Sequence, residues 1–196
     1  ILAVAAGTTI QMFDIQSKQK VSDISLQTPL VFWKWANDHI LAIVTTTSVF
    51  HFDLNNPSAA PRKIVDRHSD LSAAQIIGYK IDSTEKWVAI VALLQSNNAI
   101  VGKIQLFSIE KNASQIIDGY AASFYDYKFD GASQPSVMFA FAQKQPSSRL
   151  GLIEVVKGDA SRQNLNTVVD IPVQPGQEAD FMVGLVVSVK YETIIM

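Results

Sequence analysis

The sequence predicts an all-β protein, a partial β-propeller of four-stranded blades. Short runs rich in Val, Ile, Phe, Tyr and Trp alternate with turn residues along the 196-residue chain. No stretch sustains the apolar spacing of three and four residues that a long amphipathic helix requires. A pair of strand candidates also recurs four times, at intervals close to those of propeller blades.

The repeated pair consists of an apolar run followed by an alternating run. The first run is apolar on both faces, as expected for a strand between packed layers, and the second has one packed and one solvated face. The equivalent aromatic or apolar positions Phe13, Phe52, Phe107 and Ile153 are 39, 55 and 46 residues apart. The four copies are 1–6 with 9–15, 40–44 with 48–54, 87–93 with 103–109, and 137–142 with 149–155.

Two further strands are expected between copies, for example at 62–65 and 75–79, which makes four strands per repeat. Turn residues predict loops at 55–58, 95–98, 145–148 and 174–176, and the polar segment 157–166 predicts a long, mobile loop. A β-sandwich is the alternative fold class. It explains the short strands but not the four-strand period.

The period predicts about four blades within a single domain that covers residues 1–196. Both ends of the chain fall inside apolar runs, so we expect both to be truncated from a larger protein. A propeller that does not close exposes strand edges, and we therefore expect the isolated piece to associate.

Composition excludes several functions. With 16 basic and 18 acidic residues, the net charge of -2 gives no electrostatic reason to expect nucleic acid or a polybasic membrane anchor. There is no cysteine, which excludes disulfides and thiolate metal sites. The longest apolar runs are near eight residues, whereas a membrane-spanning helix needs about 20.

Catalytic and metal-binding patterns are not found in the sequence. The three histidines, His39, His51 and His68, have no second ligand at metal-binding spacing. Asp66-Arg67-His68-Ser69 cannot form a triad, because adjacent side chains on one short segment point to different sides. We expect Asp66 and Ser69 to bond nearby backbone N–H groups instead. The sequence therefore predicts no enzyme activity, no cofactor and no metal site.

Several specific blocks occur in a fixed order along the chain. They are Phe32-Trp-Lys-Trp35, Asp66-Arg-His-Ser69, Gln75-Ile-Ile77, Lys86-Trp87, Ala121-Ala-Ser-Phe124 and Ile153-Glu-Val155. Together these blocks resemble the N-terminal domain of the clathrin heavy chain family. The resemblance implies a seven-bladed propeller, of which about four blades are represented here. It also implies a non-enzymatic coat protein at the cytoplasmic face of coated pits and coated vesicles.

The resemblance further implies the partners. The family's propeller binds disordered adaptor tails that carry clathrin-box motifs, and it reaches membranes only through these adaptors. Clathrin light chain and other heavy chains are expected to bind parts of the protein outside this chain. A generic propeller scaffold in another complex is the alternative function.

The resemblance implies a first peptide site, the clathrin-box groove between two blades. It takes a peptide of the form Leu, apolar, any, apolar, acidic. Thr9, Gln11 and Phe13 alternate and so share one face of a strand. In the alternative interpretation Phe13 is core and the lysines form a solvated turn. The matching residues are Leu2, Thr9, Gln11, Phe13, Lys18 and Lys20.

The resemblance implies two more peptide sites. A central site for Trp-containing peptides matches Gln75, Ile77 and Leu93, with Leu93 in place of the family's usual Ile. An arrestin-type site between the fourth and fifth blades matches Trp87, Leu106, Lys111 and Gln115. Lys111 replaces an Arg, which keeps the charge but loses the planar fork. Ordinary core packing is the alternative for the apolar members of both sets.

Overall fold

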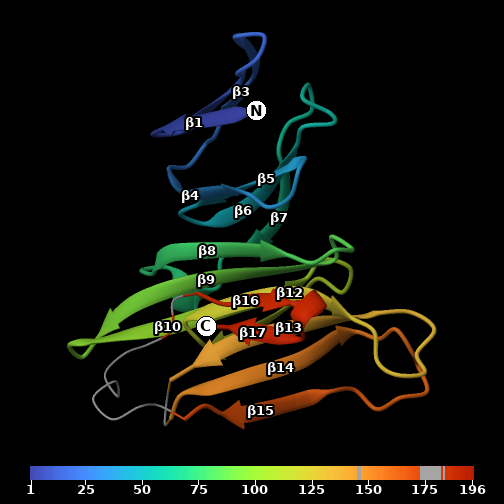
Figure 1. Cartoon of the computed structure of the whole chain (residues 1–196). Coiled ribbons are helices and arrows are strands. Elements are labelled where there is room, and N and C mark those ends of the chain that lie inside the picture. Colours follow the sequence, from blue (N-terminus) through green and yellow to red (C-terminus); the bar gives the residue numbers. More distant parts are fainter. Residues whose placement is uncertain (145–146, 173–181, 183) are drawn as a thin grey trace. The chain divides into compact units, whose positions relative to one another are not determined.

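The structure, a computed structural model, describes residues 1–144, 147–172, 182 and 184–196. These residues form strands β1–β17 and two short 3₁₀ helices (Figure 1). The chain divides into two compact units, Ile1–Ile76 and Ile77–Met196. Each unit is described by itself.

The first unit contains two antiparallel sheets. The three-stranded sheet has the order β1-β2-β3, and the four-stranded sheet has the order β4-β5-β6-β7. The 3₁₀ helix η1 (Ser69–Leu71) follows β7. The strands are β1 (Leu2–Ala6), β2 (Thr9–Asp14), β3 (Gln19–Ser25), β4 (Leu30–Trp35), β5 (Ile40–Thr45), β6 (Ser48–Asp53) and β7 (Arg62–Asp66).

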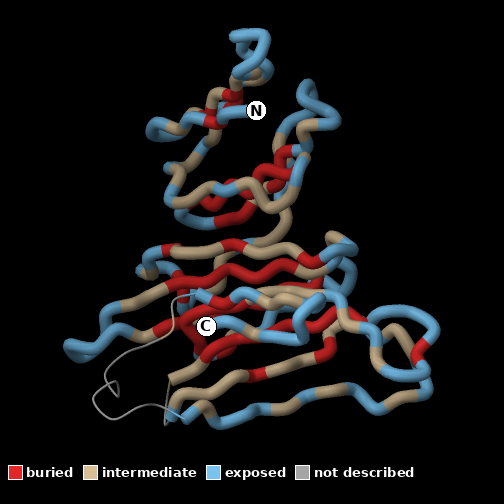
Figure 2. The backbone as a smooth tube through the Cα atoms, in the orientation of Figure 1, coloured by how far each residue is buried: buried red, intermediate tan, exposed pale blue. Residues whose placement is uncertain are grey.

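The core of the first unit lies between its two sheets. Ile10 and Met12 of β2 are fully buried and belong to one cluster with Leu41 and Ile43 of β5 and Phe52 of β6. Every residue of β5 is buried, as predicted for a strand that is apolar on both faces. Figure 2 shows this concentration of buried residues in the centre of the sheet.

Arg67 secures the chain where it leaves the four-stranded sheet. Its guanidinium donates to the backbone carbonyls of Thr46 at 2.9 Å, of Ala74 at 3.2 Å and of Leu71. His68, rather than Asp66 or Ser69, is the N-cap of η1, and its Nδ1 accepts from the N–H of Asp70 at 3.2 Å. The Asp66 carboxylate accepts from the hydroxyl of Ser48 at 2.7 Å. The Asp66–Ser69 segment is therefore structural.

The second unit contains two four-stranded antiparallel sheets and a hairpin. The sheets have the orders β11-β10-β9-β8 and β12-β13-β14-β15, and β16 pairs with β17. The 3₁₀ helix η2 (Val189–Tyr191) joins the hairpin strands. The strands are β8 (Gln75–Ile81), β9 (Trp87–Ser96), β10 (Ala99–Ser108), β11 (Ala113–Asp118), β12 (Ala121–Tyr127), β13 (Ser136–Gln143), β14 (Arg149–Val156), β15 (Asn166–Asp170), β16 (Val186–Ser188) and β17 (Thr193–Ile195).

The two four-stranded sheets of this unit pack face to face. Phe139 and Phe141 of β13 share a cluster with Leu106 of β10, and the two phenyl rings stack with centroids 5.7 Å apart. Gly151 of β14 lies opposite Phe141, where a Cβ would come within 2.1 Å of the ring. Glycine at this position lets the ring lie flat over the neighbouring strand.

The predicted strand pairs match the observed strands closely. The pairs β1/β2, β5/β6, β9/β10 and β13/β14 are the four copies of the repeat, and the strands expected at 62–65 and 75–79 are β7 and β8. Three consecutive four-stranded antiparallel sheets confirm the predicted all-β, propeller-type fold class. Such meanders are the units from which propellers are built.

Three details differ from the prediction. The loop expected at 95–98 is shorter than predicted: β9 runs through Ser96, β10 begins at Ala99, and only Asn97 and Asn98 turn, with φ of 48° and 62°. Two asparagines in this left-handed region make the tight hairpin turn that asparagine favours. β1 was expected to be covered on both faces, but Leu2 and Val4 are 48% and 49% exposed.

The third difference concerns the long polar segment. It runs as a loop through 157–165, and Asn166 already begins β15. Hydrogen bonds fix the loop to the sheet: the N–H of Gly158 donates to Ser136 Oγ at 3.0 Å, and Arg162 reaches Glu154. Of the loop predicted at 145–148, residues 147 and 148 precede β14 outside any strand, whereas 145–146 and the predicted loop at 174–176 lie outside the described residues.

Candidate functional site

The outward face of β1 and β2 carries most residues of the first predicted site. The register pairs Leu2 with Phe13, Val4 with Gln11, and Ala6 with Thr9, so these six side chains share one face. The other face of β2 is occupied by Ile10 and Met12, both fully buried. The core therefore holds the strand, and Gln11 and Phe13 face outward.

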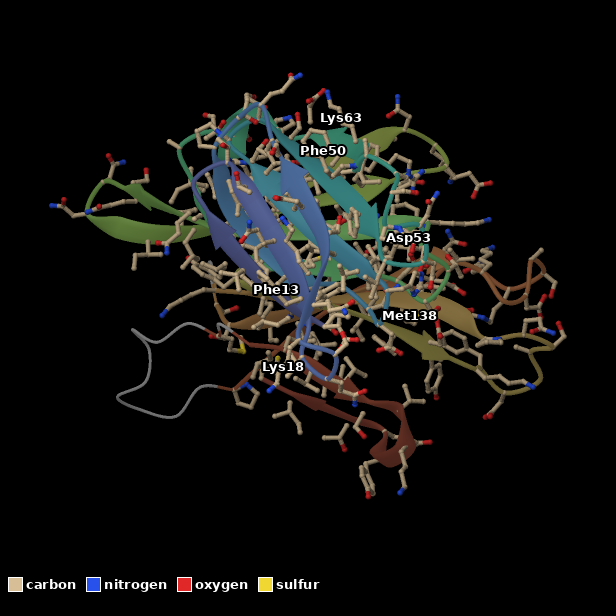
Figure 3. The ribbon with its side chains drawn as sticks, turned by 90° about the horizontal axis from the view of Figure 1, so that it is seen from above. Phe13, Lys18, Phe50, Asp53, Lys63 and Met138 are labelled. Atoms are coloured by element: carbon tan, nitrogen blue, oxygen red, sulfur yellow. The ribbon has the colours of Figure 1, made fainter. Side chains whose placement is uncertain are left out.

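Leu2 and Val4 are about half exposed, and Gln11 and Phe13 are partly buried. An exposed group of large apolar side chains is typical of a surface that binds a partner. Against the alternative interpretation, Phe13 is only partly buried and is not a member of the core cluster of this unit; in agreement with it, Lys18 lies in an exposed turn. Figure 3 labels Phe13 and Lys18 of this region.

The two predicted lysines lie at one end of this face. Lys20 of β3 is the register partner of Phe13, and its Nζ is 3.0 Å from the Asp23 carboxylate. Lys18 lies in the β2–β3 turn with φ of 56° and is exposed. Asp14, which begins the turn, accepts the N–H of Gln16 at 2.9 Å, and chiefly this bond lowers its pKa. Lys18 is thus an exposed cation in the turn that follows β2.

The second predicted set is placed on two strands. Gln75 and Ile77 are two residues apart on β8; Gln75 is exposed, and Ile77 is partly buried against the core of the second unit. Leu93 of β9 is partly buried and pairs with Gly102. The boundary between the two units falls within β8, after Ile76, so Gln75 is described separately from Ile77 and Leu93.

Three residues of the third predicted set, Trp87, Leu106 and Gln115, share one face of the β8–β11 sheet. Leu106 is the register partner of both Ala89 and Gln115, and Trp87 is the partner of Ser108. Leu106 is only 3% exposed and belongs to the core, as the alternative interpretation held, whereas Gln115 is exposed. Lys111 lies in the β10–β11 turn, where its N–H donates to Ser108 Oγ at 3.3 Å. Leu106 therefore lies within the core cluster beside Gln115, Trp87 packs against the same cluster, and Gln115 and Lys111 are exposed.

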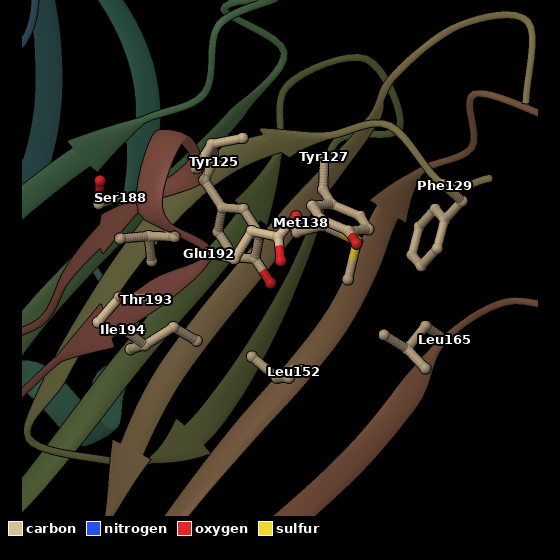
Figure 4. Close-up of a pocket in the computed structure, with 12 residues that line it drawn as sticks. Tyr125, Tyr127, Phe129, Met138, Leu152, Leu165, Ser188, Glu192, Thr193 and Ile194 are labelled. Carbon is tan, nitrogen blue, oxygen red and sulfur yellow. The ribbon is translucent and has the colours of Figure 1, made fainter.

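Sequence reasoning missed a pocket in the second unit. It has a volume of about 360 Å³ and lies between the β12–β15 sheet and the β16–β17 hairpin (Figure 4). Tyr125, Tyr127 and Phe129 line it from β12 and the residues after it, and Glu192 lines it from the hairpin. The sequence signal was the strict alternation of three aromatic residues at 125, 127 and 129, which places them on one face of a strand.

The buried ionisable group of the first unit is a histidine on β6. In the described part of the chain no three His, Asp or Glu side chains come together as a metal site. His51 of β6 is 5% exposed, and burial, with a smaller contribution from Arg62, lowers its pKa to about 4. Among the described residues, no helix is long and apolar enough to cross a membrane.

The sheets and their connectivity define the class of protein as a β-propeller. The solved N-terminal domain of Nup159 covers 94% of this chain, and the chain covers 46% of that structure. The TM-score is 0.50 and the sequence identity is 9%. A likeness at this identity concerns the fold alone.

Relatives in sequence indicate which kind of β-propeller this is. No family model matches the chain. The clathrin heavy chain of Dictyostelium discoideum is 42% identical over 198 residues, that of Drosophila melanogaster 36%, and human clathrin heavy chain 2 34%. Each match covers the whole of this chain and 12% of the relative. These matches confirm the resemblance: over its whole length the chain is homologous to one segment of clathrin heavy chains.

Proposed function

We propose that the chain is the peptide-docking region of a non-enzymatic, clathrin-type coat protein. In this proposal it binds clathrin-box motifs in the disordered tails of endocytic and sorting adaptors at the cytoplasmic face of coated pits and vesicles. Binding supports coated-vesicle formation and vesicle-mediated transport. Light chain and other heavy chains bind elsewhere on the protein, and membrane association is indirect.

The observation that carries the proposal is the outward face of β1 and β2. Leu2, Val4 and Phe13 present apolar surface beside the amide of Gln11, while the reverse face is anchored in the core. The apolar side chains of a clathrin-box peptide fit the first three, and the Gln11 amide can bond the peptide backbone. The homology to clathrin heavy chains favours this function over that of a scaffold in another complex.

Electrostatics gives this face its preference for acidic peptides. Lys18 is exposed in the turn, so an ion pair with the peptide's acidic residue contributes only about 0.2–1 kcal/mol. The apolar contacts that the peptide buries on binding therefore supply most of the affinity. A single contact of this size is weak, and many linked copies in a lattice raise the overall strength of binding.

The test is binding of the fluorescein-labelled peptide Ser-Leu-Ile-Ser-Leu-Asp-Ser to the chain, followed by fluorescence anisotropy. We expect the double variant Gln11→Ala, Lys18→Glu to weaken binding about tenfold, because a polar contact and a favourable charge are both lost. Lys63→Glu is the matched control. Lys63 is exposed on β7, where it pairs with Asp66 at 2.7 Å. Equal affinity of the double variant and the control would contradict the assignment.

The other two predicted sets remain proposals of the same kind. Trp87, Gln115 and Lys111 are proposed to bind an arrestin-type loop motif, supported by the shared face of Trp87 and Gln115 and by the exposure of Gln115 and Lys111. Gln75, Ile77 and Leu93 are proposed to bind a Trp-containing peptide, supported by the partial exposure of Ile77 and Leu93. Binding of each peptide to Gln115→Ala and Gln75→Ala variants tests both.

A further inference from the structure

We propose that the pocket between the β12–β15 sheet and the β16–β17 hairpin is a second peptide site with the opposite charge preference. Its occupant is a short peptide segment that combines an apolar side chain with a neighbouring arginine or lysine. The proposal goes beyond the clathrin-box function and does not depend on it. It concerns residues that lie wholly within the second unit.

A row of aromatic rings forms one wall of the pocket. Tyr125, Tyr127 and Phe129 follow each other at every second position, and the rings of Tyr127 and Phe129 meet edge to face with centroids 4.8 Å apart. Met138 and Leu152 complete the apolar lining from β13 and β14. All three aromatic residues are partly exposed, so the row is open to a ligand (Figure 4).

The chain itself shows which chemistry this aromatic row favours. The guanidinium of Arg162 lies 3.5 Å from the ring centroid of Phe129. Cations are attracted to the faces of aromatic rings, arginine more often than lysine. Phe129 is at one end of the row, and Tyr125 and Tyr127 continue it toward the hairpin. The internal arginine therefore occupies one end and leaves the tyrosines for an external cation.

Glu192 supplies the charge. It is the one charged side chain among the described residues that line the pocket. Its carboxylate forms no salt bridge with any other described residue. Its backbone is in the left-handed region with φ of 49°, because Glu192 is the C-cap of η2, and its N–H donates to the carbonyl of Val189 at 3.2 Å. The cap fixes the backbone from which the Glu192 side chain projects. Figure 4 shows Glu192 beside Tyr125 and Tyr127 at the pocket.

The size of the pocket and its hydroxyl groups fit a peptide. A volume of about 360 Å³ lies at the low end of the range of about 300–1,000 Å³ for ligand pockets. It suits one or two side chains better than a cofactor. Burial, with a smaller contribution from Tyr127, raises the pKa of Tyr125, so that its hydroxyl stays protonated and can donate to a peptide carbonyl.

The experiment compares two fluorescein-labelled peptides on the whole chain. They are Gly-Ser-Phe-Leu-Arg-Arg-Ser-Gly and its charge-reversed counterpart Gly-Ser-Phe-Leu-Glu-Glu-Ser-Gly. We expect the basic peptide to bind the pocket with an affinity about fivefold higher than that of the acidic peptide, as follows from one or two exposed charge contacts. Amide chemical-shift changes should centre on 125–129 and 187–194.

Two variants separate charge from shape. Glu192→Gln keeps the shape and removes the charge, and we expect it to weaken the basic peptide about threefold. Glu85→Gln is the matched control, because Glu85 also lies in a turn of the second unit with φ of 57° but does not line the pocket. Tyr127→Ser should lower the affinity about tenfold, since it removes a central aromatic anchor. Thermal unfolding verifies that this variant is folded.

Several outcomes would overturn the proposal. Equal affinity for both peptides, an equal effect of Glu192→Gln and Glu85→Gln, or shift changes away from the pocket would each do so. Self-association that is abolished by Tyr127→Ser would mean that a second copy covers the pocket. The double variant Gln11→Ala, Lys18→Glu should leave the basic peptide unaffected, so failure of this site and failure of the clathrin-box face can be told apart.

Discussion

The two units bury ionisable side chains in opposite states of charge. In the first unit His51 is buried on β6, and burial lowers its pKa to about 4, so it is neutral at physiological pH. In the second unit Glu154 is buried on β14, with its carboxylate 2.6 Å from the Arg162 guanidinium and 3.0 Å from the N–H of Leu165. A charge remains in an interior only where donors accompany it.

The pKa of Glu154 shows the same balance. Burial alone raises this pKa, but hydrogen bonds from Ser136, from the backbone of Leu165 and from Arg162 together lower it below its usual value. Arg162 has two roles, because it also lies over Phe129 at the end of the aromatic row. The surfaces differ too: the first unit presents lysines beside an apolar face, and the second presents Glu192 beside aromatic rings.

The largest expected effect is the loss of Arg162. We expect Arg162→Met to lower the free energy of unfolding by about 3 kcal/mol at pH 7, because the Glu154 carboxylate stays buried without its cation. Urea denaturation measures the change. The matched control is Lys63→Met, which breaks an exposed pair with Asp66 and should cost less than about 1 kcal/mol.

A second variant tests the cause of this loss. Adding Glu154→Gln to Arg162→Met removes the buried charge and should recover part of the lost stability, as a double-mutant cycle would show. If the double variant is as unstable as the sum of the two single variants, the pair does not act through charge, and the contrast between the units fails.

The next effect concerns His51 and pH. The unfolded chain takes up a proton at His51 below about pH 6.5, whereas the folded chain resists it until about pH 4. The folded pKa is depressed, so the stability that this neutral histidine provides is complete above pH 6.5. It is lost as pH falls from 6.5 to 4, by up to about 3 kcal/mol.

The measurement compares urea denaturation of the wild type and His51→Gln across this pH range. The variant should lose less stability than the wild type as the pH falls, because glutamine does not titrate. An NMR titration of the His51 ring gives an independent value. A midpoint near 6.5 would show that the first unit does not hold this side chain neutral.

The sequence predicted strands better than it predicted surfaces. The apolar runs at 40–44, 87–93 and 137–142 correspond to β5, β9 and β13. A short run that is apolar on both faces is typical of a strand buried between two layers. The sequence predicts a loop at 95–98 where only Asn97 and Asn98 turn, since composition cannot show how far two strands pair beside a turn. Strand alternation placed Gln11 and Phe13 on one face correctly and the family resemblance supplied Leu2, but only the register showed that Val4 joins them.

Contacts between segments that are far apart in the chain could not be predicted from the sequence. Leu106 was assigned to a binding site, but it packs against β13, which is far away in sequence. The pocket at Glu192 joins β12 to a hairpin about 60 residues later, and periodicity carries no information on such pairings. The Arg162–Glu154 ion pair could not be predicted either. The composition of a polar loop does not show which buried carboxylate its arginine will contact.

The smallest expected effect sharpens the description of the clathrin-box face. Lys20 is held by Asp23 at 3.0 Å, with both side chains more than 40% exposed, so the two charges largely cancel at this end of the face. Asp23→Asn removes the internal competitor and leaves the Lys20 ammonium for the acidic end of the peptide. An exposed pair is worth about 0.2–1 kcal/mol, so we expect the affinity for Ser-Leu-Ile-Ser-Leu-Asp-Ser to rise about twofold.

This rise in affinity should depend on charge and should be specific to the clathrin-box face. It should shrink in 0.5 M salt, because exposed charges are screened there, and it should be absent for the basic peptide that we assign to the second unit. Asp53→Asn is the matched control, since Asp53 is an exposed acid at the end of β6 in the same unit. An equal rise in both variants would mean that only the net charge matters, and Lys20 would then have no place in the peptide site.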